Sequence, residues 1–275
     1  MPDAIAPGRL KAEDEHARDI CAVGRWVHQR GMVGATDGNI SVRLDDRRVL
    51  ATPTLMSKGM MEPADLVVVD TQGKKVSGKR NASSEIAMHL LIYRRRPDVH
   101  AVVHAHPIVA TGYAAAGLAL NQALISEVVL ALGCIPLAQY GTPGTPELSE
   151  ALSPLVGTYD AILMANHGVV TYGGDLLMAY MRMETVEHFA RVSLVTHLLG
   201  RQVLLSREEV DKLSEAREKY FAGAGAPVAP LSESCPVSAD GRAGLRPESA
   251  RERFWVTREE LEALIDEAVK SGRVR

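Results

Sequence analysis

The sequence has few cysteines, and no two of them lie close together. Cys21, Cys134 and Cys235 are the three in 275 residues. So few scattered residues, in an odd number, predict neither a disulfide framework nor a CxxC zinc site, and they fit a reducing, cytoplasmic location. Any metal would therefore have to be bound by histidine and carboxylate.

A basic surplus and a long apolar run are also missing. The net charge of -3 argues against a nucleic-acid-binding protein, which usually carries a basic surplus. No apolar run approaches the roughly 18 residues of a membrane span. The first residues lack the basic start and apolar core of a signal peptide. With 46% apolar and 24% charged residues, the composition is that of an ordinary globular protein, with no nucleic-acid or membrane partner expected.

Hydrophobic periodicity predicts an α/β protein. Several strands in succession in the first third are typical of an antiparallel or mixed sheet. The predicted helices cover about 12–31, 85–95, 107–116, 148–155, 175–199 and 207–220. The predicted strands cover 40–44, 49–54, 65–70 and 99–104, and further short apolar runs cover 126–132, 135–138 and 161–164.

Two histidines with one residue between them end the predicted strand 99–104. His104 and His106 share one face, because residues two apart in a strand point the same way. His167 follows the run 161–164, and Glu85 begins a helix upstream of the pair. Three imidazoles with an open fourth position are typical of catalytic zinc. The alternative is that these histidines are packed core residues, because spacing alone does not bring His167 to the pair.

Two stretches could bind an anion. In the loop 34–43, Gly38 and Asn39 permit a tight turn with inward N–H groups, a possible anion cradle, although this stretch taken alone favours an ordinary turn before a strand. Ser83 and Ser84 precede the helix 85–95. They either cap this helix or bind a phosphate at its first free N–H groups.

The composition changes at residue 222. The segment 222–250 has 29 residues, of which 19 are Ala, Gly, Pro or Ser, and it is interpreted as a flexible linker behind a domain of residues 1–221. In 251–275, Thr257 and Glu260 have capping-box spacing. An apolar stripe then predicts a short amphipathic helix, which would be marginal alone and should dock on something.

Six motifs in fixed order identify a family resemblance. They are GNISVR (38–43), ATPT (51–54), SSE (83–85), RPDVHAVVHAH (96–106), YGTPGTPELSE (140–150) and NHG (166–168). This ordered set resembles the class II aldolase/adducin family over about residues 12–220. It is most similar to the zinc-dependent branch that cleaves L-fuculose 1-phosphate.

The resemblance implies a fold, an assembly and a site. The expected fold is a three-layer α/β/α domain around a mainly antiparallel sheet, in a C4-like homotetramer with active sites at subunit interfaces. His104, His106 and His167 match the zinc ligands. Glu85 matches a carboxylate that binds zinc at rest and moves a proton during the reaction. The residues that match the phosphate pocket are Gly38, Asn39, Thr54, Ser83 and Ser84.

The implied function is zinc-dependent retro-aldol cleavage of a ketose 1-phosphate, such as L-fuculose 1-phosphate, to dihydroxyacetone phosphate and an aldehyde. Alternatives within the family are a decarboxylase, a methylthioribulose-1-phosphate dehydratase and a 4-epimerase, which has Asp in place of Glu85. The alternative that is not an enzyme is an adducin-like binding module. The adducin head lacks the zinc histidines, so the histidines here favour an enzyme.

Three features depart from the pattern or extend beyond it. Glu127 stands where the fuculose aldolase has a tyrosine that assists the leaving aldehyde. Tyr220 corresponds only loosely to a mobile C-terminal tyrosine of the family. The helix in 251–275 resembles peptides that direct enzymes into bacterial microcompartments through shell proteins. The alternative is that this helix packs on its own tetramer.

Overall fold

The computed structural model describes residues 11–221, and the side chains through Arg217. The predicted linker 222–250 and the predicted helix in 251–275 lie outside the described residues.

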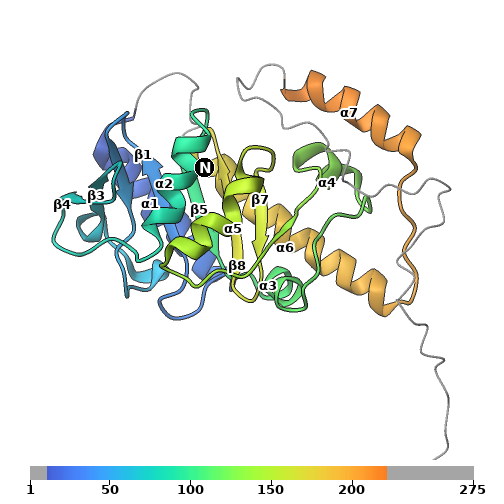
Figure 1. Ribbon diagram of the computed structural model, residues 1–275, viewed down its shortest axis with the longest axis horizontal. Coiled ribbons are helices and arrows are strands. Elements are labelled where there is room, and N and C mark those ends of the chain that lie inside the picture. Colours follow the sequence, from blue (N-terminus) through green and yellow to red (C-terminus); the bar gives the residue numbers. More distant parts are fainter. Residues whose placement is uncertain (1–10, 222–275) are drawn as a thin grey trace, which may run out of the picture.

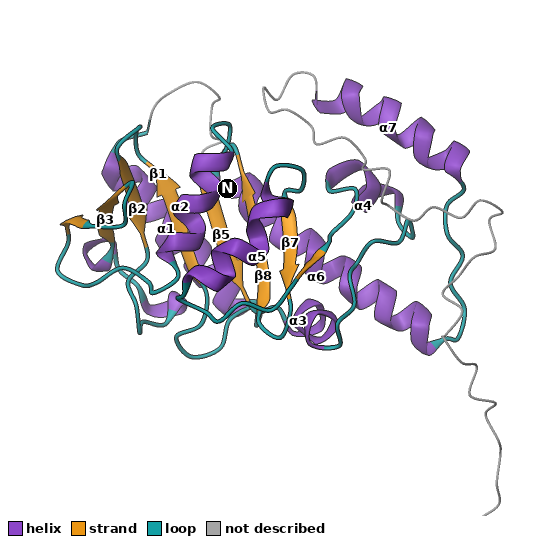
Figure 2. Cartoon of the chain, in the orientation of Figure 1, coloured by secondary structure: helices purple, strands orange, loops and turns teal. Residues whose placement is uncertain are grey.

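An eight-stranded sheet runs through the centre of the domain (Figures 1 and 2). Its order is β4-β3-β2-β1-β5-β8-β7-β6, and only β6 and β7 pair in parallel. The mainly antiparallel sheet is therefore confirmed. The strands are β1 (Asn39–Arg43), β2 (Arg48–Ala51), β3 (Val67–Asp70), β4 (Lys75–Ser77), β5 (Ala101–Ala105), β6 (Leu137–Ala138), β7 (Ala161–Met164) and β8 (Gly168–Gly173).

Helices cover both faces of the sheet, which makes three layers (Figure 1). One apolar core joins α1, α3 and α6 to one face, and a second core joins α2 and α5 to the other. Alternating strand residues supply the two cores, so that Val103 faces the first and Val102 the second. The helices are α1 (Glu13–Gln29), α2 (Ile86–Arg95), α3 (Ile108–Ala115), α4 (Ser126–Ala131), α5 (Pro146–Val156), α6 (Leu176–Leu198) and α7 (Arg207–Phe221), with 3-10 turns η1 (Lys58–Met60) and η2 (Pro63–Asp65).

Strand β8 is the main element that the sequence prediction missed. All six of its residues are buried, because it lies in the middle of the sheet with a helix layer on each side. A strand buried on both faces has no alternation of apolar and polar residues, so its period cannot be detected. The neighbouring hairpin turn uses Asn166 at a φ of 54°, a left-handed conformation that Asn tolerates better than most residues.

Among the described residues, Cys21 is a free cysteine, buried within α1. Within residues 11–221, no helix is long and apolar enough to cross a membrane.

Candidate metal centre

Neighbouring strands bring the three predicted histidines together. His104 lies in β5, opposite Val170 of β8 and Asn39 of β1. His106 follows β5 directly, and His167 lies in the turn between β7 and β8. Because β8 pairs with β5, this turn returns His167 to the pair. One ligand atom from each of the three histidines lies within 4.8 Å of the others.

The histidine geometry fits a divalent metal ion. The Nδ1 atom of His104 is 2.8 Å from the Val169 carbonyl oxygen, which can only accept, so Nδ1 carries the proton and Nε2 keeps its lone pair. The Nε2 atoms of His104 and His106 are 3.1 Å apart. Zinc bonds of about 2.0–2.1 Å in a tetrahedron place two nitrogens about 3.3 Å apart. The spacing of this pair therefore suits a divalent metal ion.

Glu85 faces this cluster from the start of α2, where it is the N-cap residue. Its Oε1 is 3.1 Å from Nε2 of His167, and its Oε2 is 3.4 Å from Nε2 of His104. Oε1 is buried without a hydrogen-bond partner, as expected of an oxygen suited to a cation. Burial raises the pKa of Glu85, whereas a proton on Nε2 of His104 and of His167 would add charge and hydrogen bonds that hold this pKa well below its usual range.

A buried chain of hydrogen bonds fixes Glu85. The Nδ2 atom of Asn39 donates to Oε2 of Glu85 at 2.7 Å, and Nε2 of His89 donates to Oδ1 of Asn39 at 2.5 Å. Since that ring nitrogen donates, Nδ1 of His89 accepts from the Ser41 hydroxyl, 2.7 Å away. The Ser41 hydroxyl in turn lies 2.8 Å from the Tyr93 hydroxyl. Burial lowers the pKa of His89 to about 3, which keeps the ring neutral and the chain intact.

None of the sequence motifs singles out His89, which is buried. What the sequence missed is its contact with Asn39. The only available signal was the spacing of four residues between Glu85 and His89, which puts both on one side of α2. Asn39 was predicted to bind phosphate, and its amide group here contacts Glu85 and His89.

The other residues predicted for the phosphate pocket lie on segments that meet beside the centre. Gly38 precedes β1 at a φ of 73°, and a Cβ atom there would lie 2.7 Å from the His104 carbonyl oxygen. Only glycine fits this position. The N–H of Thr54 donates to the Asn81 carbonyl, and the N–H of Ser83 donates to the Thr52 carbonyl. Thr54 is therefore held close to the serine pair.

Neither serine caps α2, because Glu85 occupies the N-cap position without a side-chain cap. The hydroxyl of Ser83 instead accepts the N–H of Glu85 at 3.3 Å. Ser84 is exposed to solvent. The capping alternative is thus wrong, and both hydroxyls lie directly before the residue that faces the histidines.

The two substrate-assisting candidates are not part of this cluster in the described chain. Glu127 is exposed in the first turn of α4. Within residues 11–217, it has no hydrogen bond or ion pair to the three histidines. Tyr220 lies in α7, and its side chain is outside the described part of the chain.

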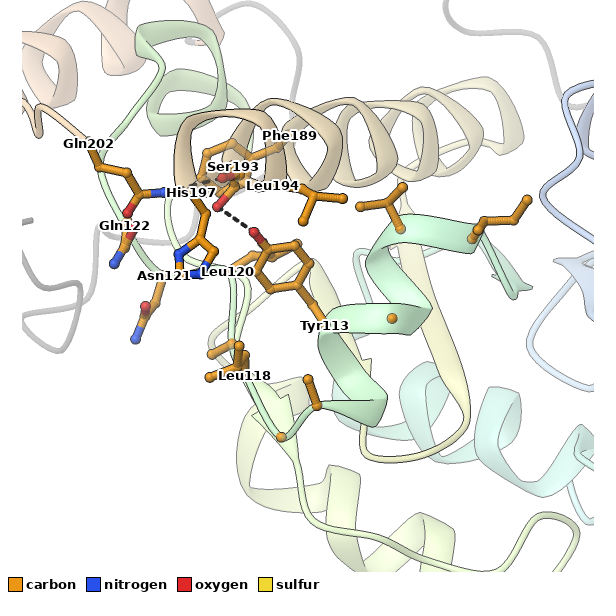
Figure 3. A pocket seen from close by; sticks show the side chains of 16 residues that line it. Tyr113, Leu118, Leu120, Asn121, Gln122, Phe189, Ser193, Leu194, His197 and Gln202 are labelled. Carbon is orange, nitrogen blue, oxygen red and sulfur yellow. Dashed lines mark hydrogen bonds between the residues drawn. The ribbon is translucent and has the colours of Figure 1, made fainter. Parts of the chain in front are cut away.

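A second concave site lies away from the histidines, between α3, the loop 116–122 and α6 (Figure 3). Its volume is about 540 Å³, and none of the three histidines lines it. At one end, the Tyr113 hydroxyl donates to Ser193 at 3.0 Å, beside His197 and Gln202. The rest of the lining is mainly apolar, so this groove offers no cluster of metal ligands.

Comparisons with known proteins agree with the geometry. The family described as Class II Aldolase and Adducin N-terminal domain matches residues 18–194. The 3-oxo-tetronate 4-phosphate decarboxylase of Haemophilus influenzae is 37% identical over 174 residues, 62% of this chain and 82% of that protein. The 5-deoxy-D-ribulose 1-phosphate aldolase of Bacillus thuringiensis serovar kurstaki is 31% identical over 203 residues, 74% of this chain and 95% of that protein. A solved L-fuculose 1-phosphate aldolase has a TM-score of 0.70 at 30% identity, covering 76% of this chain and 99% of the other.

Proposed function

Because this chain belongs to the class II aldolase and adducin family, we propose that it is a zinc-dependent lyase that cleaves the C3–C4 bond of a ketose 1-phosphate. L-Fuculose 1-phosphate is the proposed type of substrate, and the products are dihydroxyacetone phosphate and an aldehyde. A solved relative, 30% identical and covering 76% of this chain, is named L-fuculose 1-phosphate aldolase.

The observation that carries the proposal is the position of Glu85. Its carboxylate lies 3.1 Å and 3.4 Å from the ring nitrogens of two of the three histidines, and Asn39 holds it there. A general acid or base must lie within hydrogen-bond reach of the reacting atom. A carboxylate beside the metal ligands is well placed to reach a substrate that binds at the same point.

The position of Glu85 indicates which groups lose and gain a proton in the reaction. When the C3–C4 bond breaks, its electron pair moves toward C3 and the carbonyl at C2, and the C4 hydroxyl loses its proton as the aldehyde forms. Glu85, a carboxylate at rest, takes up the proton that the C4 hydroxyl releases and delivers it to C3, and it carries the proton in the opposite sense in the synthetic direction. A divalent ion on His104, His106 and His167 would supply Lewis-acid stabilisation of the negative charge that develops on the carbonyl oxygen.

The phosphate would bind where the segments 52–54 and 83–84 meet. Ser84 is exposed there, and Gly144 of a neighbouring loop lies against it, since a Cβ atom on Gly144 would be 3.3 Å from the Ser84 Cβ. Hydroxyls and backbone N–H groups at the start of α2 suit a dianion. Fixing the phosphate at this point would hold the reacting carbon in register with Glu85.

A decarboxylase acting on a sugar-acid phosphate is the second candidate, and Glu127 is the observation that favours it. Carbon dioxide leaves without giving up a hydroxyl proton, so this reaction needs no tyrosine at the leaving group. Glu127 stands in place of that tyrosine. The Haemophilus influenzae relative is named as such a decarboxylase.

One assay separates the two candidates. The purified protein is incubated with the 1-phosphates of L-fuculose, L-rhamnulose, L-ribulose and 5-deoxy-D-ribulose, and with 3-oxo-tetronate 4-phosphate. Release of dihydroxyacetone phosphate from a ketose 1-phosphate supports the aldolase. If the protein releases carbon dioxide from 3-oxo-tetronate 4-phosphate and cleaves none of the ketose 1-phosphates, the aldolase proposal is wrong and the decarboxylase proposal is supported.

Metal content tests the centre independently of substrate. We expect about one zinc per chain in the wild-type protein. His104→Ala should lose both zinc and activity. His100→Ala is the matched control, because His100 is exposed just before the same strand. A His104→Ala protein that keeps its zinc would contradict the proposed ligand set.

A further inference from the structure

Lys58 is buried next to the metal centre, and the proposed reaction does not use it. It begins η1, directly after the loop 52–57 that follows β2, and only 1% of its surface is accessible. A fully buried lysine is rare unless its ammonium group is paired. The position therefore needs a physical explanation.

Its ammonium group joins two loops. The Nζ atom donates to the Thr36 carbonyl at 2.9 Å and to the Met56 carbonyl at 2.5 Å. Thr36 lies in the loop 34–38, which leads to Gly38 and Asn39. Met56 lies in the loop 54–57, which begins at Thr54. Lys58 therefore links two loops that carry two of the residues predicted for the substrate pocket, Gly38 and Thr54, and the first loop leads directly into a third, Asn39.

The backbone of Lys58 is held by α1. A Cβ atom on Gly24 of that helix would lie only 2.6 Å from the Lys58 carbonyl oxygen, so α1 and η1 are in tight contact. One turn further along α1, the ring of His28 packs against Gly59, where a Cβ atom would lie 2.5 Å from the ring. The side chain thus extends from a fixed base toward the loops.

Both loops contain residues in conformations that need support. Ala35 has a φ of 41° and Leu55 a φ of 55°, the left-handed region that residues other than glycine rarely adopt. Leu55 is 82% exposed, so packing of its own side chain does not hold it in place. Such conformations persist only where surrounding contacts impose them. The carbonyls bound by Lys58 directly follow these two residues in the chain.

The charge of Lys58 is costly to bury. Burial lowers the pKa of its ammonium group to about 8, and Asp37 and Glu85 are the carboxylates that oppose this shift. Asp37 lies on the same loop as Thr36, and its Oδ2 is 3.5 Å from Nδ1 of His106. A buried ionisable group with a shifted pKa beside a candidate site is itself a candidate for a role in that site.

We propose that Lys58 is a positioning residue whose buried ammonium group holds the loops 34–38 and 54–57 in the shape that binds a phosphorylated ligand. The identity of the ligand rests on the proposed function, whereas the link between the loops does not. Lys58 acts through these loops and does not itself contact the reacting atoms.

Replacing Lys58 by a neutral residue of similar length tests this role. In Lys58→Met, amide hydrogen exchange in 34–38 and 54–57 should be at least about tenfold faster. The affinity for dihydroxyacetone phosphate, measured by calorimetry, should fall about tenfold, or about 1.4 kcal/mol. Zinc should stay at about one per chain. Lys58→Arg should restore part of the affinity. Lys74→Met, on the exposed turn before β4, should resemble the wild type.

Unchanged exchange and affinity in Lys58→Met would overturn the proposal. If that variant does not fold, Lys58→Gln takes its place with the same expected losses. If both fail to fold while Lys58→Arg folds, Lys58 serves the stability of the whole domain and the proposal is wrong. If the wild-type protein binds no dihydroxyacetone phosphate, the proposed function fails, while hydrogen exchange still decides whether Lys58 holds the loops.

Discussion

At the scale of single residues, the centre depends on groups whose protonation is fixed by their neighbours. His104 is held in one tautomer by the Val169 carbonyl, and Glu85 is fixed by Asn39, which is itself fixed by His89. Such supporting contacts around metal ligands usually matter almost as much as the ligands themselves. Glu85, the proposed proton carrier, and His89, which supports it through Asn39, can therefore be tested separately.

Replacing Glu85 by glutamine should remove the proton carrier with little change in shape. We expect kcat to fall by about 10²–10⁴, the usual contribution of a positioned acid or base. Zinc should be retained on the three histidines. Exchange of the C3 hydrogen of dihydroxyacetone phosphate with deuterated water, followed by NMR, should fall equally. Glu150→Gln, exposed on α5, is the control, and normal exchange in Glu85→Gln would show that another group moves the proton.

The buried His89 should make folding sensitive to acid. Its pKa is lowered to about 3 in the folded protein, against about 6.5 in the unfolded chain. Between these values only the unfolded state takes up the proton, so the free energy of unfolding falls as the pH drops from about 6.5. One such proton corresponds to about 1.4 kcal/mol per pH unit.

His89→Gln keeps a group that can donate to Asn39 but does not titrate. Urea unfolding at several values between pH 4 and 6 should therefore give a shallower dependence on pH than in the wild type. His100→Gln, at an exposed site, should keep the wild-type slope. Equal slopes in all three proteins would mean that His89 does not contribute.

At the scale of elements, a buried ion cluster ties both helix layers to the sheet. Asp160, just before β7, pairs with Arg96 after α2 at 2.9 Å and with Arg182 of α6 at 2.7 Å. Arg96 also pairs with Asp98 at 2.7 Å. The cluster lies on the strand whose far end leads to His167, so it helps to place that turn.

Asp160→Ala should leave two largely buried guanidinium groups without their shared partner. Breaking a buried pair in this way costs about 3–5 kcal/mol. Chemical denaturation should show this loss, whereas Asp211→Ala on the exposed side of α7 should change stability by less than about 0.5 kcal/mol. A loss no larger than that of the control would mean that the cluster adds nothing to stability.

At the scale of the whole molecule, the assembly remains a prediction. Large apolar side chains are exposed at the start of α3 and at the end of α6, where Ile108, Leu198 and Leu199 are each more than 70% accessible. Exposed apolar groups of this kind often mark an interface between proteins. They fit the homotetramer that the family resemblance implies, with active sites between subunits.

Light scattering after gel filtration should give a mass of about four chains of 29.7 kDa each. In such a tetramer a neighbouring subunit could complete the substrate pocket, which would explain why Glu127 does not reach the histidines within one chain. A monomer that is fully active would rule out a shared site.

The C-terminal segment 251–275 makes a second prediction at this scale. Deletion of the segment should leave zinc content and kcat unchanged, because the described domain contains the whole metal centre. If the segment targets a shell, the deletion should abolish recovery of the enzyme with purified microcompartment shells. Unchanged recovery would favour a helix that packs on its own tetramer.

The sequence by itself determined the chemistry of the site and most of the elements. Helical periodicity located α1, because burial of one side of that helix leaves a repeat of 3.6 residues. Glu85, His104, His106 and His167 were identified from residue type, spacing and motif order. Strand β8 left no such repeat, since both of its faces are buried.

Only the tertiary structure decided which of these residues meet. The pairing of β5 with β8 brings His167 to His104, which lies 63 positions away in sequence, and the hydrogen bonds of Asn39 join it to Glu85 and His89. Lys58 reaches Thr36 only because α1 and η1 pack closely. Local sequence patterns reflect neighbours within a few residues, whereas contacts between distant segments depend on how the sheet and its helices pack.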